Sequence, residues 1–260
     1  MKKYLKLWLT MTNRTTQIAF ASRFGVVLFT FGKVIRFLLF LVFLFILTSK
    51  TKSIAGYTTW EVILFFVTFN FIDMIAQFLW RDVYRFRSYI VSGNFDLLLS
   101  KPISPLLRSL FGGSDILDLL TLIPLIGFLF YVTSQIGNIA FVGVFLYILL
   151  LFNALIIALS LHIFVLSLGI ISTEVDNAIW MIREITQLGR IPINVYPKPV
   201  SLFFTYVLPV AAMITFPSQA LIGILSWQGV VVSFLFSSIL LFLSLRSWNF
   251  ALRQYASASS

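Results

Sequence analysis

The sequence predicts an all-α polytopic membrane protein with six transmembrane helices. Of its 260 residues, 60% are hydrophobic and only 11% are charged, and the mean hydropathy is +1.00. A soluble domain carries roughly 25% charged residues. Apolar runs, each long enough to cross the hydrocarbon core, alternate with short segments that hold most of the Lys and Arg side chains. We expect a single transmembrane domain over residues 1–260.

The composition also restricts the class of function. The formal net charge is +10, but the basic side chains cluster beside apolar runs, which is typical of orientation signals and anionic-lipid contacts rather than of nucleic-acid binding. With no Cys and a single His, His162, the chain offers no thiolate or His cluster for a metal. It also lacks the G-x-x-x-x-G-K-[ST] loop and the common catalytic motifs. We therefore expect a protein that is not an enzyme and binds no cofactor itself.

The first two predicted elements differ in charge. Residues 1–24 mix basic with apolar side chains, which predicts an amphipathic helix lying in the cytoplasmic membrane interface. The first span, 25–48, carries Lys33 and Arg36 in its first half. A charge at the bilayer centre costs about 2.5 to 3.5 kcal/mol on insertion scales. We expect these two side chains to snorkel to the interface rather than to face the bundle.

The next two spans flank a basic segment. The second span, 58–80, contains Asp73, which we expect to form a structural hydrogen bond rather than to bind an ion or a proton. The segment 81–108 holds the densest group of Arg residues, so the positive-inside rule places it in the cytoplasm. The third span is 114–131. Two carboxylates in its first turns are expected to complement the helix N-terminus, and these are Asp115 and Asp118.

The second half of the chain has two solutions, because residues 139–171 carry no charge apart from His162 and form a run longer than one span requires. In the first solution this run is one helix, 172–200 is cytoplasmic and 201–222 is the fifth span. In the second, the chain turns near His162. Its further parts are then a fourth span over 139–160, a fifth span over 163–188 and an outer re-entrant segment over 189–226. Both solutions end with a sixth span, 229–245, and place both termini in the cytoplasm.

Residues 93–106 carry a motif punctuated by Gly and Pro between two apolar runs. The motif resembles the cytoplasmic G-x-x-D-x-L-L-x-x-P-x-x-P-L signature of type-2 ATP-binding-cassette (ABC) transporter permeases, in the subgroup of six-helix exporter subunits. The matching residues are Gly93, Asp96, Leu98, Leu99, Pro102, Pro105 and Leu106. A later stretch is similar to the Pro-rich outer segment of this family, and it contains Pro192, Tyr196, Pro197, Pro209 and Pro217. This resemblance favours the second solution.

The resemblance implies a role for each region. A cytoplasmic coupling helix after the second span would dock into a separate ATPase subunit, and the residues expected to serve coupling are Arg81, Asp82, Arg85, Arg87, Gly93 and Asp96. The Pro-rich re-entrant segment before the sixth helix would cap the exit path. The charged residues of the fifth span are candidates for lining a polar translocation path. These are Glu174, Asp176, Arg183 and Glu184, for which the alternative is a surface helix at the membrane edge.

The resemblance also implies partners. The chain would act as a dimer, with an identical or similar permease subunit, in contact with membrane lipid and with two copies of an ATPase subunit that bind ATP and Mg. We expect its location to be a bacterial cytoplasmic membrane. The alternative function is an ATP-independent channel or an ion-coupled secondary transporter, in which Asp73 and the charged group at 174–184 would be the midplane charges.

Overall fold

The computed structural model describes residues 2–51, 53–172 and 175–255, with Val175 and Asp176 described as helix backbone only. Within these ranges, five helical stretches are long and apolar enough to cross a membrane, and a bent helix pair could supply a sixth crossing. The five stretches are Arg23–Thr51, Thr59–Val91, Ile116–Ile136, Phe141–Ser172 and Trp227–Gln254. The prediction of an all-α polytopic membrane protein is confirmed.

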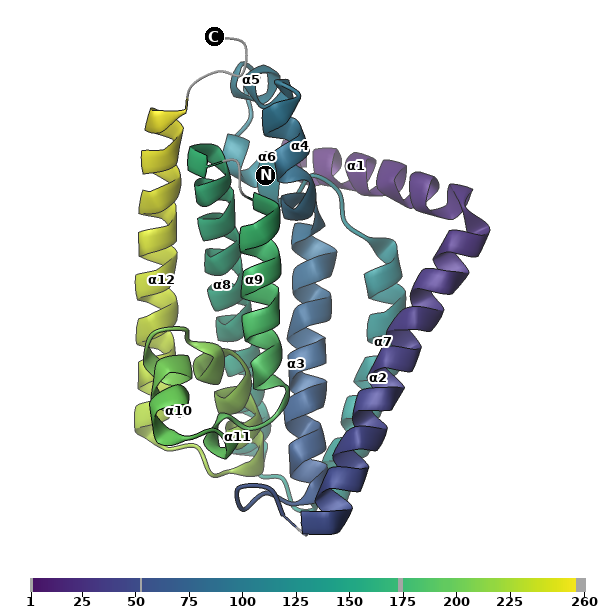
Figure 1. Cartoon of the computed structure of the whole chain (residues 1–260), viewed down its shortest axis with the longest axis vertical. Coiled ribbons are helices and arrows are strands. Elements are labelled where there is room, and N and C mark those ends of the chain that lie inside the picture. The colour runs from purple at the N-terminus through teal and green to yellow at the C-terminus, as the bar shows by residue number, and fades with distance from the viewer. Residues whose placement is uncertain (1, 52, 173–174, 256–260) are drawn as a thin grey trace.

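The N-terminal helix α1 (Lys2–Ala21) lies across one end of the bundle, and α2 (Arg23–Thr51) descends from it at a sharp angle (Figure 1). No residue of α1 is buried. A hydrogen bond from Trp8 Nε1 to Ser114 Oγ, at 2.9 Å, fixes this helix to the segment before α7. Helix α1 therefore lies on the outside of the bundle, and the later helices form the interior.

The centre of the bundle is α3 (Thr59–Trp80), which is flanked by α2 and α7 on one side and by α8 and α9 on the other (Figure 1). Residues 62–69 are an uninterrupted buried apolar run apart from Thr68, as expected for a helix surrounded by other helices. The Thr68 hydroxyl is satisfied by the Tyr147 hydroxyl of α8, 3.0 Å away. Helix α3 is therefore the element against which the others are positioned.

Helices α8 (Phe141–Ser172) and α12 (Trp227–Gln254) pack along most of their length, and three buried polar side chains join them. The Asn153 amide donates to Ser233 Oγ at 2.7 Å and accepts from Ser237 Oγ at 2.5 Å. Small residues such as these two serines allow close approach of membrane helices, and a polar group without a partner would be costly there. The pair forms the wall opposite α2.

The turn predicted near His162 is wrong, since α8 continues unbroken to Ser172. The His162 ring is satisfied inside the helix bundle: its Nδ1 lies 2.8 Å from the Ala158 carbonyl oxygen, and the ring packs on Trp80 at 5.2 Å. A single polar residue with local partners does not require the chain to turn. The predicted spans 139–160 and 163–188 are thus replaced by one 32-residue helix and a shorter helix, α9 (Val175–Gln187).

Helix α9 has 13 residues, so it is about 20 Å long and cannot alone cross a hydrocarbon core of about 30 Å. It runs along the bundle beside α8 rather than across its end (Figure 1). A series of short elements continues from it. They are η2 (Leu188–Arg190), η3 (Ile193–Val195), α10 (Lys198–Tyr206), the π-helical η4 (Ala211–Thr215) and α11 (Phe216–Ile222). The α10 and 211–222 pair is bent by 78° at residues 207–210.

Short helices also form the opposite end of the bundle. They are η1 (Arg81–Arg85), α4 (Phe86–Val91), α5 (Asn94–Leu99) and α6 (Pro105–Leu110), and they precede α7 (Ile116–Ile136). Gly93 adopts φ +71°, which allows the sharp turn from α4 into α5. We call residues 85–99 the tip. It lies at the same end of the bundle as α1 and the end of α12, and away from α10 and α11 (Figure 1).

Candidate functional site

Two adjoining cavities lie between α2, α3 and α9, with volumes of about 410 Å³ and 630 Å³. They share four lining residues: Gly32, Lys33, Arg36 and Gln77. We call the two cavities together the groove. Its size is that of a site for a small or medium-sized organic molecule.

Helical periodicity brings the lining side chains to one face of each helix. On α2, Lys33, Arg36 and Phe40 follow at intervals of three and four residues, and on α9 Trp180, Arg183 and Gln187 do the same. From α3 into η1, every fourth residue is polar: these are Asp73, Gln77 and Arg81. The charges inside otherwise apolar helices therefore converge on the groove and do not face lipid.

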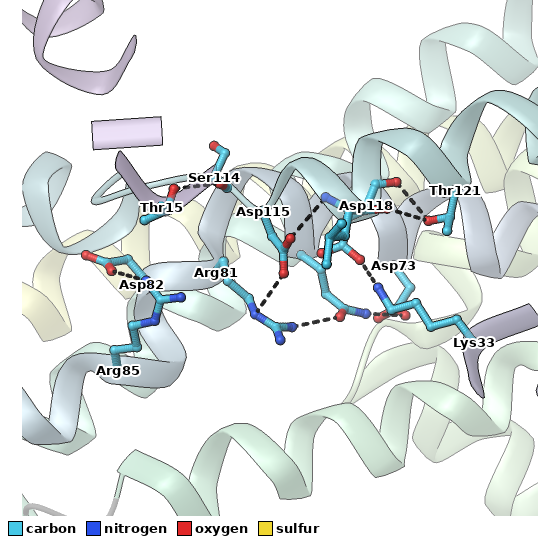
Figure 2. Close-up of polar contacts among 12 residues, drawn as sticks. Thr15, Lys33, Asp73, Arg81, Asp82, Arg85, Ser114, Asp115, Asp118 and Thr121 are labelled. Carbon is cyan, nitrogen blue, oxygen red and sulfur yellow. Dashed lines mark hydrogen bonds and ion pairs between the residues drawn. The ribbon is translucent and has the colours of Figure 1, made fainter. Parts of the chain in front are cut away.

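A chain of polar contacts runs along the α3 wall of the groove. The Gln77 amide nitrogen donates to Asp73 Oδ2 at 2.6 Å, and Arg81 donates to Gln77 Oε1 at 3.2 Å. The Arg81 Nε atom lies 3.7 Å from Asp115 Oδ2 (Figure 2). The expected structural hydrogen bond of Asp73 is present, with Gln77 one turn further along as its partner. Asp115 also caps α7, as expected, because its Oδ1 accepts from the Leu117 amide at 3.0 Å.

Lys33 does not snorkel, contrary to our prediction. Its ammonium group forms an ion pair with the Asp118 carboxylate, which is fully buried (Figure 2). Asp118 lies in the first turn of α7, as expected, and its carboxylate also joins α7 to α2. An intramembrane cation that finds a carboxylate on a neighbouring helix gains more than one that reaches past two turns to the interface.

Three basic side chains of the groove form no ion pair within the described ranges: Arg36, Arg183 and Arg190. The Arg190 guanidinium lies over the rings of Phe40 and Phe69, at 5.3 and 5.1 Å. The Arg183 guanidinium lies over Trp180 at 5.4 Å. Aromatic faces hold such cations in place without neutralising them.

The basic side chains lining the groove outnumber the acidic ones. The basic set is Lys33, Arg36, Arg81, Arg85, Arg183 and Arg190, and the acidic set is Asp73 and Glu184. Each of the two acids receives a hydrogen bond from an amide, Asp73 from Gln77 and Glu184 from Gln187 at 3.0 Å. The lining therefore carries an excess of positive charge, although Lys33, Arg81 and Arg85 lie beside carboxylates of the surrounding helices.

The structure brings two of the four predicted path residues, Arg183 and Glu184, to the groove. Glu174 lies outside the described residues, and the side chain of Asp176 is not described. Sequence reasoning missed Arg36 and Arg190 as groove residues. The signal that could have found Arg36 is its spacing of three from Lys33 within an apolar helix, which places both cations on one face.

The residues predicted to serve coupling fall into two groups. Asp82 is 2% exposed, and its carboxylate is paired with Arg108 at 2.7 Å and with Arg85 at 3.8 Å. Gly112 leaves room for this contact, since an added Cβ would collide with the Asp82 carboxylate and the Arg108 guanidinium. Arg81 points toward Asp115 at the groove (Figure 2). Arg81 and Asp82 are therefore held inside the bundle, whereas Arg85 and Arg87 are exposed.

The tip is anchored by aromatic rings. Phe95 is fully buried and packs against Phe86 at 5.2 Å, against Trp248 at 6.5 Å and against Tyr255 at 5.1 Å. Gly93 makes the turn before it, and Asp96 lies in the first turn of α5. Three apolar side chains of the tip remain exposed, and these are Val91, Leu97 and Leu99. The tip thus has a buried face on α12 and an open apolar face.

The predicted outer segment is compact. Pro192, Pro209 and Pro217 are buried, Pro197 precedes the first turn of α10, and the Tyr196 hydroxyl donates to the Leu188 carbonyl at 2.9 Å. The α2–α3 loop meets this segment at Tyr57. The Tyr57 hydroxyl accepts from Gln219 at 2.8 Å and from Asn194 at 3.4 Å. Burial raises the pKa of Tyr57, so its phenol stays neutral and keeps these contacts at physiological pH.

Comparison with protein families matches residues 34–259 to the family described as ABC-2 family transporter protein. The match begins inside α2 and takes in the rest of the groove, the tip and the outer segment. Comparison with curated proteins gives no match.

Proposed function

The chain belongs to the ABC-2 transporter family, and from this premise we propose that it is the transmembrane permease subunit of an ATP-driven ABC exporter. The groove between α2, α3 and α9 is its part of the translocation path. Membership of the family makes the chain a membrane transport subunit rather than a catalytic one. The energy source, the direction of transport and the path are the parts that we add.

The observation that carries the proposal is the convergence of charges on the groove. Charged side chains inside membrane spans are costly, and they are retained mainly where they pair or line a route for a polar solute. Lys33 and Arg81 are paired with carboxylates, but Arg36, Arg183 and Arg190 are not paired in the described part of the chain. A purely structural bundle would gain nothing from these three cations.

The energy is proposed to come from a separate ATPase subunit that binds ATP and Mg, in two copies per assembly. The sequence contains no P-loop motif to cradle a nucleotide. The tip offers a docking surface of suitable chemistry, since Arg85 and Arg87 can pair with carboxylates and the exposed Val91 and Leu97 can enter an apolar groove. Asp96 and Gly93 shape the tip rather than contact the partner.

Two contacts would carry motion of the tip to the groove. On one side, η1 follows α3 directly, so a shift of the tip moves Arg81 relative to Asp115 at the wall of the groove. On the other side, Phe95 packs on Trp248 of α12. Packed side chains have discrete arrangements, so displacement of the tip would switch the helices between two states rather than bend them gradually.

A second permease subunit, identical or similar, would complete the path. Helix α2 borders the groove on one side only, and its outer face consists of exposed apolar side chains. Membrane helices associate through such faces by close packing rather than by a hydrophobic driving force. The outer segment 189–226, with its bent helix pair, would close the far end of the path in each subunit.

The test is purification of the tagged chain from its native membranes in a neutral detergent. An ATPase subunit should co-elute, and the eluate should hydrolyse ATP when Mg is present. The alternative, an ion-coupled transporter or channel, has its own signature: the chain alone in vesicles would carry a proton or ion flux that Asp73→Asn abolishes. Elution without an ATPase, together with such a flux, would replace the proposal by this alternative.

A further inference from the structure

We infer that the groove binds anionic amphiphiles, molecules in which a phosphate or carboxylate headgroup is attached to an apolar chain. This inference rests on the proposed function, because it names the substrate class of the same groove. The arguments for it are the uncompensated charge of the groove, the fixed position of one guanidinium and the apolar wall that opens beside it.

The charge of the groove favours an anion. Three of its basic side chains lie within 4.0 Å of protein carboxylates: Lys33 pairs with Asp118, Arg81 with Asp115, and Arg85 with Asp82, which also pairs with Arg108. The remaining three, Arg36, Arg183 and Arg190, have no carboxylate within 4.0 Å in the described ranges. The two acids of the groove, Asp73 and Glu184, offset part of this charge from a greater distance, and the lining keeps an excess of positive charge that an incoming anion would balance.

The position of Arg190 indicates the kind of anion. The rings of Phe40 and Phe69 hold its guanidinium at 5.3 and 5.1 Å, and its Nε atom is buried without a hydrogen-bond partner. A planar guanidinium fixed in this way presents paired N–H donors that match the two oxygens of a carboxylate or phosphate. A cationic headgroup would be repelled by this guanidinium, and a neutral one would leave the positive charge of the groove unbalanced.

The basic residues also form an ordered series. Helix α3 runs toward the tip and α9 away from it (Figure 1). By their positions in the chain, Arg85 and Arg81 follow the tip end of α3, Arg183 lies within α9, and Arg190 follows the far end of α9. Arg36 lies on the facing helix, α2, and lines both cavities. An anionic headgroup could therefore be passed from one guanidinium to the next and remain close to a positive charge along the groove.

The apolar wall indicates what the headgroup is attached to. The cavity that contains Arg190 is lined by Phe40, Phe66 and Met74, and its rim by Leu39 and Phe43, which are 65% and 50% exposed. These two side chains belong to the outward apolar face of α2, so the rim offers an acyl chain an apolar surface next to the arginines, whether lipid or the second subunit lies against that face. An acyl chain can remain there while its headgroup contacts the arginines, whereas a soluble anion would gain only the headgroup contact.

The experiment measures binding of tritiated dodecyl phosphate to the purified full chain, immobilised in a neutral detergent, by scintillation proximity. Unlabelled dodecyl phosphate and laurate should displace the label. Inorganic phosphate should compete at least a hundredfold more weakly, and dodecyltrimethylammonium should not compete. Equal competition by inorganic phosphate would overturn the amphiphile class in favour of a soluble anion, and equal competition by dodecyltrimethylammonium would overturn the anionic one.

Variants locate the binding. The triple variant Arg36→Gln, Arg183→Gln, Arg190→Gln should weaken binding at least a hundredfold, and the corresponding triple Lys variant should weaken it less, because the charge remains while the paired donors are lost. Arg246→Gln is the matched control, since Arg246 of α12 also lies over an aromatic ring, Phe242, at 5.2 Å but lines neither cavity. Unchanged affinity of the triple Gln variant would place the amphiphile elsewhere and overturn the inference.

The binding assay uses no ATPase, so its result does not depend on whether the proposed energy source is correct. Absence of binding, with an ATPase co-purifying, would overturn the substrate class and leave the permease assignment in place. Binding to the groove by a chain that associates with no ATPase would support the substrate class and contradict the energy source.

Discussion

Phe95, at the start of α5, packs edge-on against Trp248 of α12, with ring centroids 6.5 Å apart and ring planes at 85°. Trp248 is 3% exposed and Phe95 is fully buried. The contact joins the exposed tip to the last long helix, although the two residues are far apart in the sequence. In a permease driven from outside, such a contact determines whether movement of the tip reaches the transmembrane helices.

Phe95→Ala should therefore release the tip from α12. Loss of a buried Phe costs about 3 to 5 kcal/mol, because the surrounding side chains cannot fill the cavity. We expect reduced co-elution of the ATPase and a lower melting temperature of the purified chain, and only mild effects for Phe95→Leu. Phe250→Ala is the control, since Phe250 lies on the same helix and is 58% exposed. Equal effects of the two Ala variants would show that the contact is unimportant.

Asp82→Asn should destabilise the start of the coupling segment. It removes the buried partner of Arg108 and leaves a guanidinium that is 15% exposed without its carboxylate. Breaking a buried ion pair in this way costs about 3 to 5 kcal/mol. Thermal unfolding in detergent measures the change. The double variant Asp82→Asn, Arg108→Gln should recover part of the loss, and additive losses would mean that the two residues act separately.

Gly189→Ala should disturb the junction between α9 and the outer segment. An added Cβ would collide with the Ile214 side chain and lie 2.8 Å from Val210 Cγ1. Overpacking of this kind costs about 1 to 3 kcal/mol. Ile214→Val removes the closest methyl group and should restore part of the stability. Gly127→Ala is the matched control, because a Cβ there meets no atom within 4 Å; a loss as large as that of Gly189→Ala would argue against a steric cause.

The tip and the outer segment should lie on opposite sides of the membrane. The chain has no native Cys, so single Cys variants can be labelled selectively. Leu97→Cys in the tip and Val195→Cys in the outer segment replace exposed side chains. In intact cells, an impermeant thiol reagent should label Val195→Cys only, and in inside-out vesicles Leu97→Cys only. Labelling of both from one side would refute the topology.

Hydropathy and charge were sufficient to predict the architecture, because the cost of placing backbone and charge in lipid acts on every segment. Four of the five long apolar helices, α2, α3, α7 and α12, and the polar interruption after α3 follow directly from it. The end of α8 could not be predicted in this way. An apolar run of more than thirty residues contains no signal for where the chain leaves the membrane, and the partners that satisfy His162 are on another helix or one turn away.

The groove was only partly predictable for a similar reason. The sequence shows that Arg183 and Glu184 are unusual in a span, but it does not show which helix faces them. Lys33 illustrates the difficulty, since its partner Asp118 lies 85 residues away. Arg190 falls within the predicted outer segment 189–226, whereas its position over Phe40 and Phe69 follows from the packing of three separate helices.

The most direct test of the central claim, that a separate ATPase drives this chain through the tip, is the double variant Arg85→Glu, Arg87→Glu. Co-elution of the ATPase from native membranes and its rate of ATP hydrolysis should both fall by about tenfold or more. The matched control Arg14→Glu, Arg23→Glu reverses two exposed arginines on α1 and α2, away from the tip, and should change neither. Unchanged co-elution and ATP hydrolysis in the tip variant would contradict the claim.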